Sequence, residues 1–450
     1  MIKDHKHKTL QMTKKIISIL ALVFITQFGF SQTLDKSKLD SYFNALEENN
    51  KFMGSVALSQ NGKVIYTKQI GYADIDNKIK PNDYTKYRIG SISKTFTTVL
   101  VFKAIEEQNL KLTDHIDQYF PSVKNAKKIT ISNLLYHRSG IHNFTAIEDY
   151  LQWNTEKKSE KQLVELIAKS GSDFEPDTKA EYSNSNFVLL TFILQKIYKK
   201  DYARLLTERI TKPLGLTNTS FGKKTDIKNN ETYSYSWKGK WMKEAETDMS
   251  IPMGAGAIVS TPVDLTKFAD ALFSGKLVST KNLELMKTLK DHYGMGLFRV
   301  PFGDKFGYGH TGGIDGFTST LYHFSDNNVS MALTSNGTNY DNNQIAIALL
   351  SAAYFKPYDV PIFKKVEMRN EDLDKYTGVY TTNQIPLKIT ITRNDNTLIA
   401  QATGQSSFPL EATEKNKFKF EQAGVALEFN PADKTMILKQ GGGVFTFTRE

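Results

Sequence analysis

The chain has 450 residues and contains no cysteine, and its 58 Lys and Arg against 48 Asp and Glu give a formal net charge of +10. The absence of cysteine excludes disulfide bonds, thiol catalysis, and zinc or iron–sulfur sites built on cysteine. A hydrophobic content of 40% and a charged content of 24% are ordinary for a globular protein, which excludes wholesale disorder.

The first 31 residues have the pattern of a secretory signal peptide. Five lysines precede an apolar stretch at residues 16–30, and small residues surround a predicted cleavage site after Ser31. This stretch is shorter than the roughly 20 residues that a membrane-spanning helix needs. Cleavage leaves 53 basic and 47 acidic residues, a net charge of +6 with both signs interspersed. We therefore expect an exported protein, periplasmic or secreted, with no stable membrane span and no nucleic-acid partner.

Residues 32–355 are predicted to form one α+β domain. The pattern predicts a helix over residues 37–50, then a hairpin over 54–74 with an Asn61-Gly62 turn. Further helices are predicted over residues 93–110, 162–168, 187–199 and 344–354, and strands over 317–324 and 329–335. Strands at both ends with helices between them favour an antiparallel sheet that is assembled from the two ends and flanked by helices.

The C-terminal part differs in character. Residues 356–371 contain two prolines and many charges, which is typical of a linker. Residues 372–450 consist of short strand-like runs separated by turns such as Asn394-Asp395-Asn396. We predict a small all-β domain there, either a barrel or a sandwich.

Several common catalytic patterns are missing or out of place. The sequence has neither His-Glu-x-x-His nor Gly-x-Ser-x-Gly, so we predict no metal and no α/β-hydrolase elbow. Residues 307–312 fit the dinucleotide fingerprint, but a strand pattern follows them where that motif needs a helix, and no cofactor is predicted. Four scattered histidines are predicted to be surface or structural residues: His115, His142, His292 and His323.

Ser91-Ile92-Ser93-Lys94, at the start of the predicted helix 93–110, is the strongest candidate for chemistry. Residues three apart share a helix face, so the lysine can approach the Ser91 hydroxyl. Burial could lower the pKa of that lysine enough to make it a base. The pattern alone does not show that Ser91 is catalytic. Ser220-Phe221-Gly222-Lys223 repeats it, and Ser91 could simply cap the helix.

Tyr182-Ser183-Asn184 is the second candidate, just before the predicted helix 187–199. A phenol could relay a proton between nucleophile and leaving group, and the amide could hold the lysine or a substrate carbonyl.

His310-Thr311-Gly312-Gly313, just before the predicted strand 317–324, is the third candidate. Its glycines suit a substrate that pairs with an edge strand, and the N–H groups of Gly313 and Ser91 could form an oxyanion hole. Lys169-Ser170-Gly171 imitates this motif but precedes Tyr182 in the chain.

In this order, the three motifs resemble those of the serine β-lactamase and penicillin-binding-protein superfamily, and within it the class C-like serine hydrolases. The resemblance covers about residues 36–355 and is closest at residues 88–97, with support from residues 134–141, 213–221, 254–256 and 293–297. It implies a β-lactamase/transpeptidase-like fold with a helical subdomain. It also implies these roles: nucleophile Ser91; proton-handling pair Lys94 and Tyr182; substrate-binding Asn184, His310, Thr311 and Gly312; oxyanion hole Ser91 and Gly313.

One departure bears on activity. Class C β-lactamases have lysine where this chain has His310, whereas related D-alanyl-D-alanine carboxypeptidases, D-aminopeptidases and some esterases have histidine. The resemblance therefore implies a D-amino-acid peptidase or carboxypeptidase acting through an acyl-enzyme on peptidoglycan-type peptides or a related small amide or ester, ahead of an esterase or a β-lactamase. The alternative from another class is a non-catalytic cell-wall or penicillin-binding protein that uses an aromatic loop, although an ordinary packed hairpin explains the same residues: Tyr233, Tyr235, Trp237 and Trp241.

Overall fold

The computed structural model describes residues 33–363, 368, 370–440 and 442–450. The predicted signal peptide lies outside these residues, as does part of the predicted linker. No helix within the described ranges is both long enough and apolar enough to cross a membrane.

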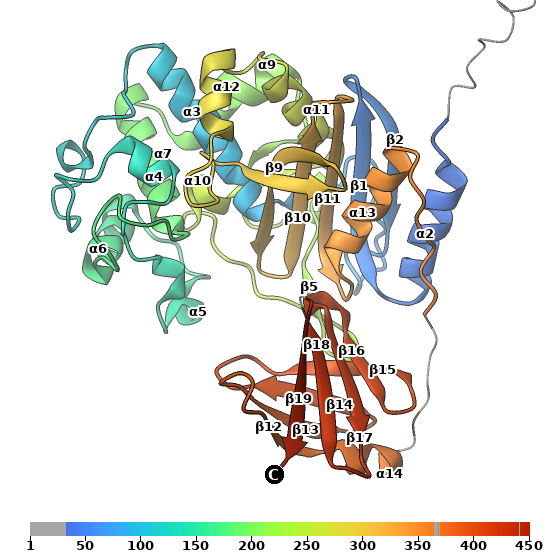
Figure 1. The fold of residues 1–450 in the computed structure, drawn as a ribbon. Coiled ribbons are helices and arrows are strands. Elements are labelled where there is room, and N and C mark those ends of the chain that lie inside the picture. The colour runs from blue at the N-terminus through green and yellow to red at the C-terminus, as the bar shows by residue number, and fades with distance from the viewer. Residues whose placement is uncertain (1–32, 364–367, 369, 441) are drawn as a thin grey trace, which may run out of the picture. The chain divides into compact units, whose positions relative to one another are not determined.

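A six-stranded antiparallel sheet forms the centre of the first domain, in the order β2-β1-β11-β10-β9-β8 (Figure 1). The N-terminal hairpin pairs with the C-terminal strands through β1 and β11, with Ala57 opposite Ala332. The sheet is therefore assembled from both ends of the domain, as the sequence predicts. Its strands are β1 Phe52–Gln60, β2 Lys63–Ile70, β8 Phe298–Phe302, β9 Lys305–Ile314, β10 Phe317–Phe324 and β11 Val329–Thr338.

Helices cover both faces of this sheet. On one face, α13 (Asn342–Ala353) begins with Asn342, whose amide donates to Thr318 of β10. On the other face, α11 (Pro262–Phe273) supplies Asp270, which accepts a hydrogen bond from Ser59 of β1. Helix α2 (Lys36–Glu48) packs on the β1–β2 hairpin. Because both faces are covered, β1 and β11 are buried along almost their whole length.

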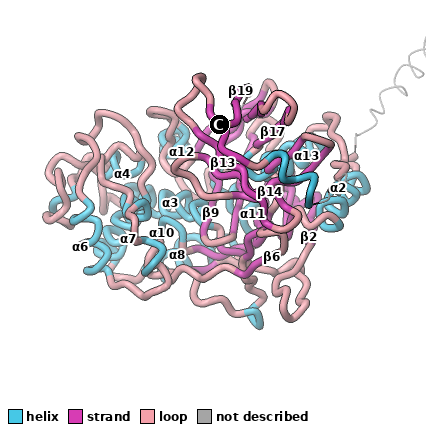
Figure 2. The backbone as a smooth tube through the Cα atoms, turned by 90° about the horizontal axis from the view of Figure 1, so that it is seen from below, coloured by secondary structure: helices cyan, strands magenta, loops and turns pink. Residues whose placement is uncertain are grey.

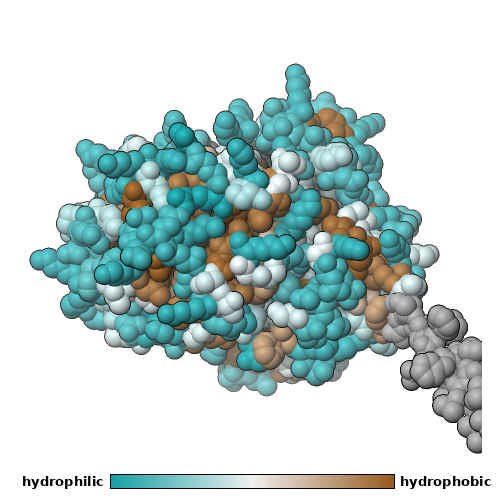
Figure 3. Space-filling model, turned by 90° about the horizontal axis from the view of Figure 1, so that it is seen from above, coloured by the Kyte–Doolittle hydropathy of each residue, from teal (hydrophilic) through white to brown (hydrophobic). Residues whose placement is uncertain are grey.

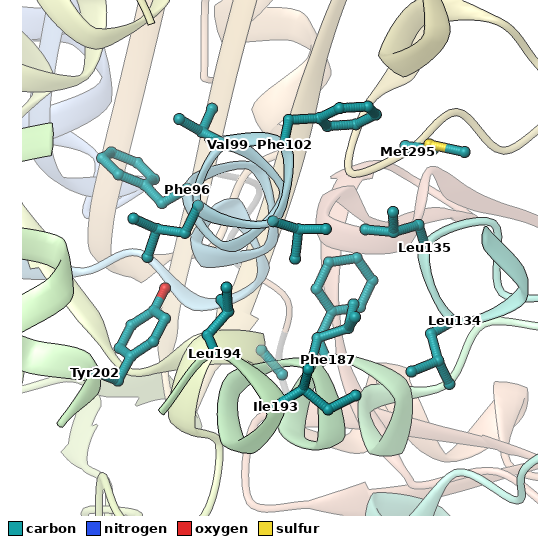
Figure 4. Close-up of a cluster of buried hydrophobic side chains, with 14 of the residues drawn as sticks. Phe96, Val99, Phe102, Leu134, Leu135, Phe187, Ile193, Leu194, Tyr202 and Met295 are labelled. Atoms are coloured by element: carbon teal, nitrogen blue, oxygen red, sulfur yellow. The ribbon is translucent and has the colours of Figure 1, made fainter. Parts of the chain in front are cut away.

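A helical subdomain is inserted between β2 and β8, around α3 (Ser93–Glu106), and Figure 2 shows its helices beside the strands. Helix α3 is buried on all sides from Ser93 to Phe102, and Figure 4 shows side chains of α3, α4 and α7 meeting around it. It ends before residue 110 because Gln108 takes a left-handed conformation. The other helices after β2 are α4 Ile131–Leu135, α5 Tyr150–Trp153, α6 Glu160–Ser170, α7 Asn184–Tyr198, α8 Tyr202–Leu206, α9 Lys212–Leu214, α10 Met253–Gly256 and α12 Thr280–Lys287.

Five short strands complete the first domain: β3 Tyr87–Arg88, β4 Ser220–Phe221 and β7 Ile258–Ser260 in one sheet, and β5 Tyr235–Trp237 and β6 Trp241–Lys243 in a hairpin. On the face drawn in Figure 3 hydrophilic residues predominate and hydrophobic ones form separate patches, which fits a mixed charged surface.

The C-terminal domain is a closed eight-stranded barrel, preceded by α14 (Asn370–Leu373). Aromatic rings of Tyr376, Phe418 and Phe429 meet in its core at centroid distances of 4.9 to 5.5 Å. The sequence predicts a barrel or a sandwich, and the pairing of β12 with β19 makes it a barrel. Its strands are β12 Gly378–Thr381, β13 Lys388–Asn394, β14 Thr397–Ala402, β15 Phe408–Glu414, β16 Lys417–Phe420, β17 Val425–Asn430, β18 Thr435–Gln440 and β19 Gly443–Arg449.

Candidate active site

Ser91 lies in a single 3₁₀ turn, Gly90–Ile92, directly before α3. Gly90 has φ 49°, and a Cβ at that position would lie 2.7 Å from the Gly313 nitrogen of β9. A Cβ on Gly312 would lie 2.0 Å from the Ile89 carbonyl oxygen and 2.9 Å from the Ser91 nitrogen. Glycine is therefore required on both sides of this contact, where the backbone of the serine turn touches β9.

Two of the three sequence motifs meet at the Ser91 hydroxyl, and the third contacts the backbone of the serine turn through Gly312 and Gly313. Ser91 Oγ lies 2.8 Å from Lys94 Nζ and 2.8 Å from the Tyr182 hydroxyl. Lys94 comes from the first turn of α3, and Tyr182 from the segment that leads into α7. Because Ser91 is partly exposed while Lys94 is fully buried, a substrate can reach the hydroxyl but water has little access to the amine.

Lys94 has two further oxygen partners, Asn184 Oδ1 at 2.7 Å and the Ala255 carbonyl at 2.8 Å. Burial lowers the pKa of Lys94 well below its ordinary value of 10.5. The two fixed oxygens stabilise the ammonium form and so limit that fall. A lowered pKa makes Lys94 a candidate base for the Ser91 proton.

Asn184 is held by two residues that the sequence did not point to. Asn184 Nδ2 donates to Thr145 Oγ1 at 3.0 Å, and the Asn184 backbone N–H donates to Asn143 Oδ1 at 3.0 Å. The bond to Thr145 orients the amide with Oδ1 toward Lys94, and the bond to Asn143 anchors the backbone. Asn184 is also the first residue of α7, which begins before the predicted residue 187 because of this anchoring.

Tyr182 presents a protonated phenol to Ser91. Burial raises the pKa of Tyr182 above its ordinary value of 10.0. Its hydroxyl therefore donates to Ser91 Oγ, and the serine proton is left to point at another acceptor. Lys94 Nζ is the nearest such acceptor when the amine is neutral.

His310 is buried in β9, with its ring centroid 6.4 Å from that of Tyr182. Burial, followed by the charge of Lys94, lowers the pKa of His310 to about 3, and its Nδ1 is bonded to the Thr311 carbonyl oxygen. It is therefore a neutral imidazole. Strand β8 pairs with β9 only from Lys305 to Gly309, so residues 310–314 lie beyond the end of β8. The predicted open edge is thus formed by β9 itself, a strand that the sequence pattern did not reveal.

A cavity of about 730 Å³ opens beside Ser91, Asn184 and Gly313. Three of the residues that line it are carboxylates: Glu148, Glu244 and Asp315. None of the described residues that line it is a lysine or an arginine. A larger cavity of about 820 Å³ shares Glu244 and Thr247 with it but does not contain Ser91. The smaller one is the candidate substrate cavity because it holds the predicted nucleophile.

Asp315 is tied into the wall of this cavity by Arg88. The guanidinium of Arg88, 3% exposed, donates to Asp315 at 3.0 Å, to Glu246 at 2.8 Å and to the Thr247 carbonyl at 2.8 Å. Arg88 lies three residues before the nucleophile, so it connects the serine turn, the segment around Glu246 and the β9–β10 turn. Of the three lining carboxylates, Glu148 and Glu244 form no ion pair with any described residue.

The competing motifs lie elsewhere. Ser220 is exposed in the short strand β4 and does not start a helix. Lys169 and Ser170 end α6. The dinucleotide-fingerprint residues 307–312 lie within strand β9 and do not precede a helix, as a dinucleotide-binding motif would need. The aromatic loop is the β5–β6 hairpin, in which Trp237 and Trp241 pack edge to face at 5.0 Å.

Residues 39–354 match the family model described as Beta-lactamase. The chain belongs to this family. It is 29% identical over 310 residues to a teichoic acid D-alanine hydrolase of Staphylococcus aureus (strain MRSA252), covering 67% of this chain and 74% of that protein. The structure of a D-amino acid amidase from Ochrobactrum anthropi SV3, complexed with L-phenylalanine amide, is similar with a TM-score of 0.62 and 26% identity, covering 71% of this chain and 99% of that one.

A penicillin-binding protein homologue from Pyrococcus abyssi covers 92% of this chain and 99% of its own, with a TM-score of 0.64. At 22% identity it bears on the fold alone, including the C-terminal part. The predicted superfamily, fold class and hydrolase activity are confirmed by this family membership.

His137 was not predicted as a site residue, although it lies in one of the stretches that carry the resemblance. Its ring packs against that of Tyr182 at a centroid distance of 4.5 Å. Asn143 and Thr145 follow the same stretch within eight residues. The signal that could have pointed to all three is a cluster of hydrogen-bonding side chains directly after the apolar turn at residues 134–136.

Proposed function

We propose that this enzyme hydrolyses small amides or esters of D-amino acids whose α-ammonium group is free, through an acyl-enzyme on Ser91. The observation that carries the proposal is the charge of the cavity beside Ser91. A D-aminoacyl substrate brings a positive charge next to its scissile carbonyl, and Glu148 and Glu244 supply negative charge there. The similarity to a D-amino acid amidase and to a teichoic acid D-alanine hydrolase supports the same substrate class.

The same cavity argues against carboxypeptidase action. A carboxypeptidase substrate carries a free carboxylate on its leaving group, and such a group is held best by arginine or lysine. The described lining of the cavity has neither, and its carboxylates repel a second negative charge. We therefore place the D-aminoacyl amidase or esterase ahead of the carboxypeptidase that the resemblance also allows.

In the proposed acylation step, neutral Lys94 accepts the Ser91 hydroxyl proton while Oγ bonds to the substrate carbonyl carbon. The N–H groups of Ser91 and Gly313 are proposed to donate to the resulting oxyanion. Tyr182 gives its hydroxyl proton to the leaving amine or alcohol as that bond breaks, and it regains a proton from the Lys94 ammonium. The step leaves an ester on Ser91, a released amine or alcohol and a neutral lysine.

Deacylation follows the same path in reverse with water. The water gives one proton to Lys94 and its oxygen to the acyl carbon, and Ser91 Oγ leaves with the proton of Tyr182, which Lys94 replaces. Asn184 is proposed to hold Lys94 and the substrate carbonyl through its amide. Residues 310–312 are proposed to pair with the substrate along the open part of β9.

A substrate panel tests this proposal. D-alanine amide and a D-alanyl ester are compared with the L-enantiomers, with N-acetyl-D-alanine amide, with a D-alanyl-D-alanine peptide and with a penicillin. We expect hydrolysis of the free D-aminoacyl compounds, loss of activity on N-acetylation, and no turnover by Ser91→Ala. The variants Glu244→Gln and Glu148→Gln should raise KM only for substrates with a free ammonium. Equal cleavage of the N-acetylated amide would overturn the charge argument.

We propose further that the protein is exported and that residues 1–31 are a cleaved signal peptide. The lysine-rich start followed by a short apolar stretch supports this. N-terminal sequencing of the protein from cells that express the full chain tests it, with a start at Gln32 as the expected result. A protein that retains residues 1–31 would contradict the proposal.

A further inference from the structure

His137 forms two hydrogen bonds with the segment that carries Tyr182. The Glu181 N–H donates to the His137 carbonyl oxygen at 2.9 Å, and the Ser183 N–H donates to His137 Nδ1 at 3.1 Å. The backbone N–H groups of the two residues that flank Tyr182 are therefore both bonded to His137. The His137 ring also packs on the Tyr182 ring at 4.5 Å with an interplanar angle of 32°.

This arrangement depends on an uncommon backbone conformation. His137 has φ 57°, in the left-handed region that non-glycine residues seldom adopt. The residue follows α4, whose first turn is fixed by a capping box between Thr130 and Asn133. The turn that results brings both the carbonyl and the imidazole of His137 to face the same segment. Conformations of this kind persist where the surroundings hold them, and they gather at functional sites.

The imidazole is neutral and has one defined tautomer. Because Nδ1 accepts the Ser183 N–H, the ring hydrogen is on Nε2. Burial lowers the pKa of His137 well below 6.5, and the charge of Lys94 lowers it further. A proton on Nδ1 would remove the acceptor and break the contact with Ser183. The hydrogen bond from the Ser183 N–H therefore requires a neutral imidazole.

We propose that His137 is a positioning residue that holds the Tyr182 hydroxyl against Ser91 Oγ by fixing the backbone N–H groups of Glu181 and Ser183, the residues on either side of Tyr182. The phenol must stay about 2.8 Å from Oγ to pass its proton to the leaving group. Tyr182 precedes α7, whose first residue is Asn184, and it has no helical turn of its own to hold it. This inference rests on the proposed proton transfer by Tyr182.

The test is a double-mutant cycle between His137→Phe and Tyr182→Phe, assayed on a D-aminoacyl amide. The phenylalanine keeps an aromatic ring beside Tyr182 and removes both ring nitrogens, including the Nδ1 acceptor. We expect H137F to lower kcat about 10- to 100-fold with KM within about twofold, because small misplacements of a reacting group have effects of this size. In the Y182F background the same substitution should have no further effect on kcat, since it acts through the phenol.

Two further variants make the result unambiguous. His137→Asn tolerates the left-handed conformation and offers Oδ1 in place of Nδ1, so it should keep kcat within about threefold of the wild type. His323→Phe is the matched control, because His323 is also buried, stacks on Phe273 at 4.3 Å and does not line the substrate cavity. It should leave kcat unchanged.

The outcomes distinguish the proposed proton transfer by Tyr182 from the proposed positioning role of His137. A kcat for Y182F equal to that of the wild type would overturn the proposed function of Tyr182. An H137F loss that is as large in the Y182F background as in the wild type would overturn the positioning role, and so would an active H137F. If H137F does not fold, a folded H137N with kcat reduced more than tenfold overturns the role, and one with kcat retained supports it.

Discussion

Replacing Arg88 by methionine removes the cation that holds the wall of the substrate cavity together. Methionine keeps most of the side-chain volume, so the change is chiefly one of charge and hydrogen bonds. The side chains of Arg88 and Asp315 are each 3% exposed, whereas that of Glu246, the other carboxylate on this guanidinium, is 23% exposed. Water can solvate Glu246 after the substitution, but it has little access to Asp315.

The free energy of unfolding should fall by about 3–5 kcal/mol, which is the usual cost of removing one partner of a buried ion pair. The cost should depend on pH. Burial raises the pKa of Asp315 even beside Arg88, and loss of the cation raises it further. An acid whose pKa is higher in the folded state than in the unfolded state destabilises the folded state once it ionises. The loss of unfolding free energy in R88M is therefore full at alkaline pH and shrinks as the pH falls toward the pKa of Asp315.

Urea unfolding of R88M and wild type at pH 8 and pH 5 measures this. Adding Asp315→Asn should recover part of the loss at pH 8, since it removes the unpaired charge. The control is Lys128→Met, which breaks a solvent-exposed pair with Glu175 and should change stability far less. An R88M deficit that does not vary with pH, or no recovery in R88M/D315N, would refute the reasoning.

Three further predictions concern the site itself. Lys94→Met should lower kcat by at least about a hundredfold because it removes the proposed base. It should leave stability unchanged or higher because it removes a buried amine, and thermal unfolding measures this. A drop in stability with kcat retained would contradict both expectations. Gly312→Ala should abolish activity, since its Cβ would lie 2.0 Å from the Ile89 carbonyl, whereas Gly239→Ala in the open β5–β6 turn should not; both are read from steady-state rates on folded protein. Ser220→Ala should leave acylation by an active-site ester unchanged while Ser91→Ala abolishes it, and equal labelling of the two variants would assign the wrong serine.

The fold could be predicted largely because its signals are local. The Asn61-Gly62 turn, the buried strand over Phe317–Phe324 and the apolar α13 each stand out within a short window of sequence. Strand β9 could not be recognised, because four glycines within Lys305–Ile314 remove the alternation that marks a strand. Those glycines are needed for close approach to neighbouring backbone, as at Gly312 against Ile89.

The site could be predicted only where a motif exists. Ser91, Lys94 and Tyr182 could be predicted as candidates because each belongs to a short pattern with a chemical reason, and the structure brings Lys94 and Tyr182 within hydrogen-bonding distance of Ser91. The Ala255 carbonyl, Asn143 and the Nδ1 of His137 are hydrogen-bonding groups with no such pattern, and their relevance comes from tertiary contacts alone. A backbone carbonyl in particular can accept from Lys94 whatever side chain its residue carries, so sequence cannot single it out.

The charges of the site divide between a neutral centre and an anionic wall. The pKa values of Lys94, His137 and His310 are all lowered by burial, and for the two histidines the charge of Lys94 is the next cause. A positive charge on any of the three therefore disfavours a charge on the others. A substrate ammonium in the cavity adds one more cation nearby and should lower the pKa of Lys94 further, which keeps that lysine in its base form.

This coupling has a kinetic signature. If Lys94 is the base, as proposed, the acidic limb of kcat/KM is expected to report the pKa of Lys94 in the free enzyme, and the acidic limb of kcat its pKa in the complex with substrate. For a D-aminoacyl amide, the limb of kcat should lie at lower pH than that of kcat/KM. An uncharged slow substrate, such as a short acyl ester, should show the two limbs at the same pH. If the ester shows the same separation, the shift comes from closure of the cavity around any substrate and the ammonium plays no part in it.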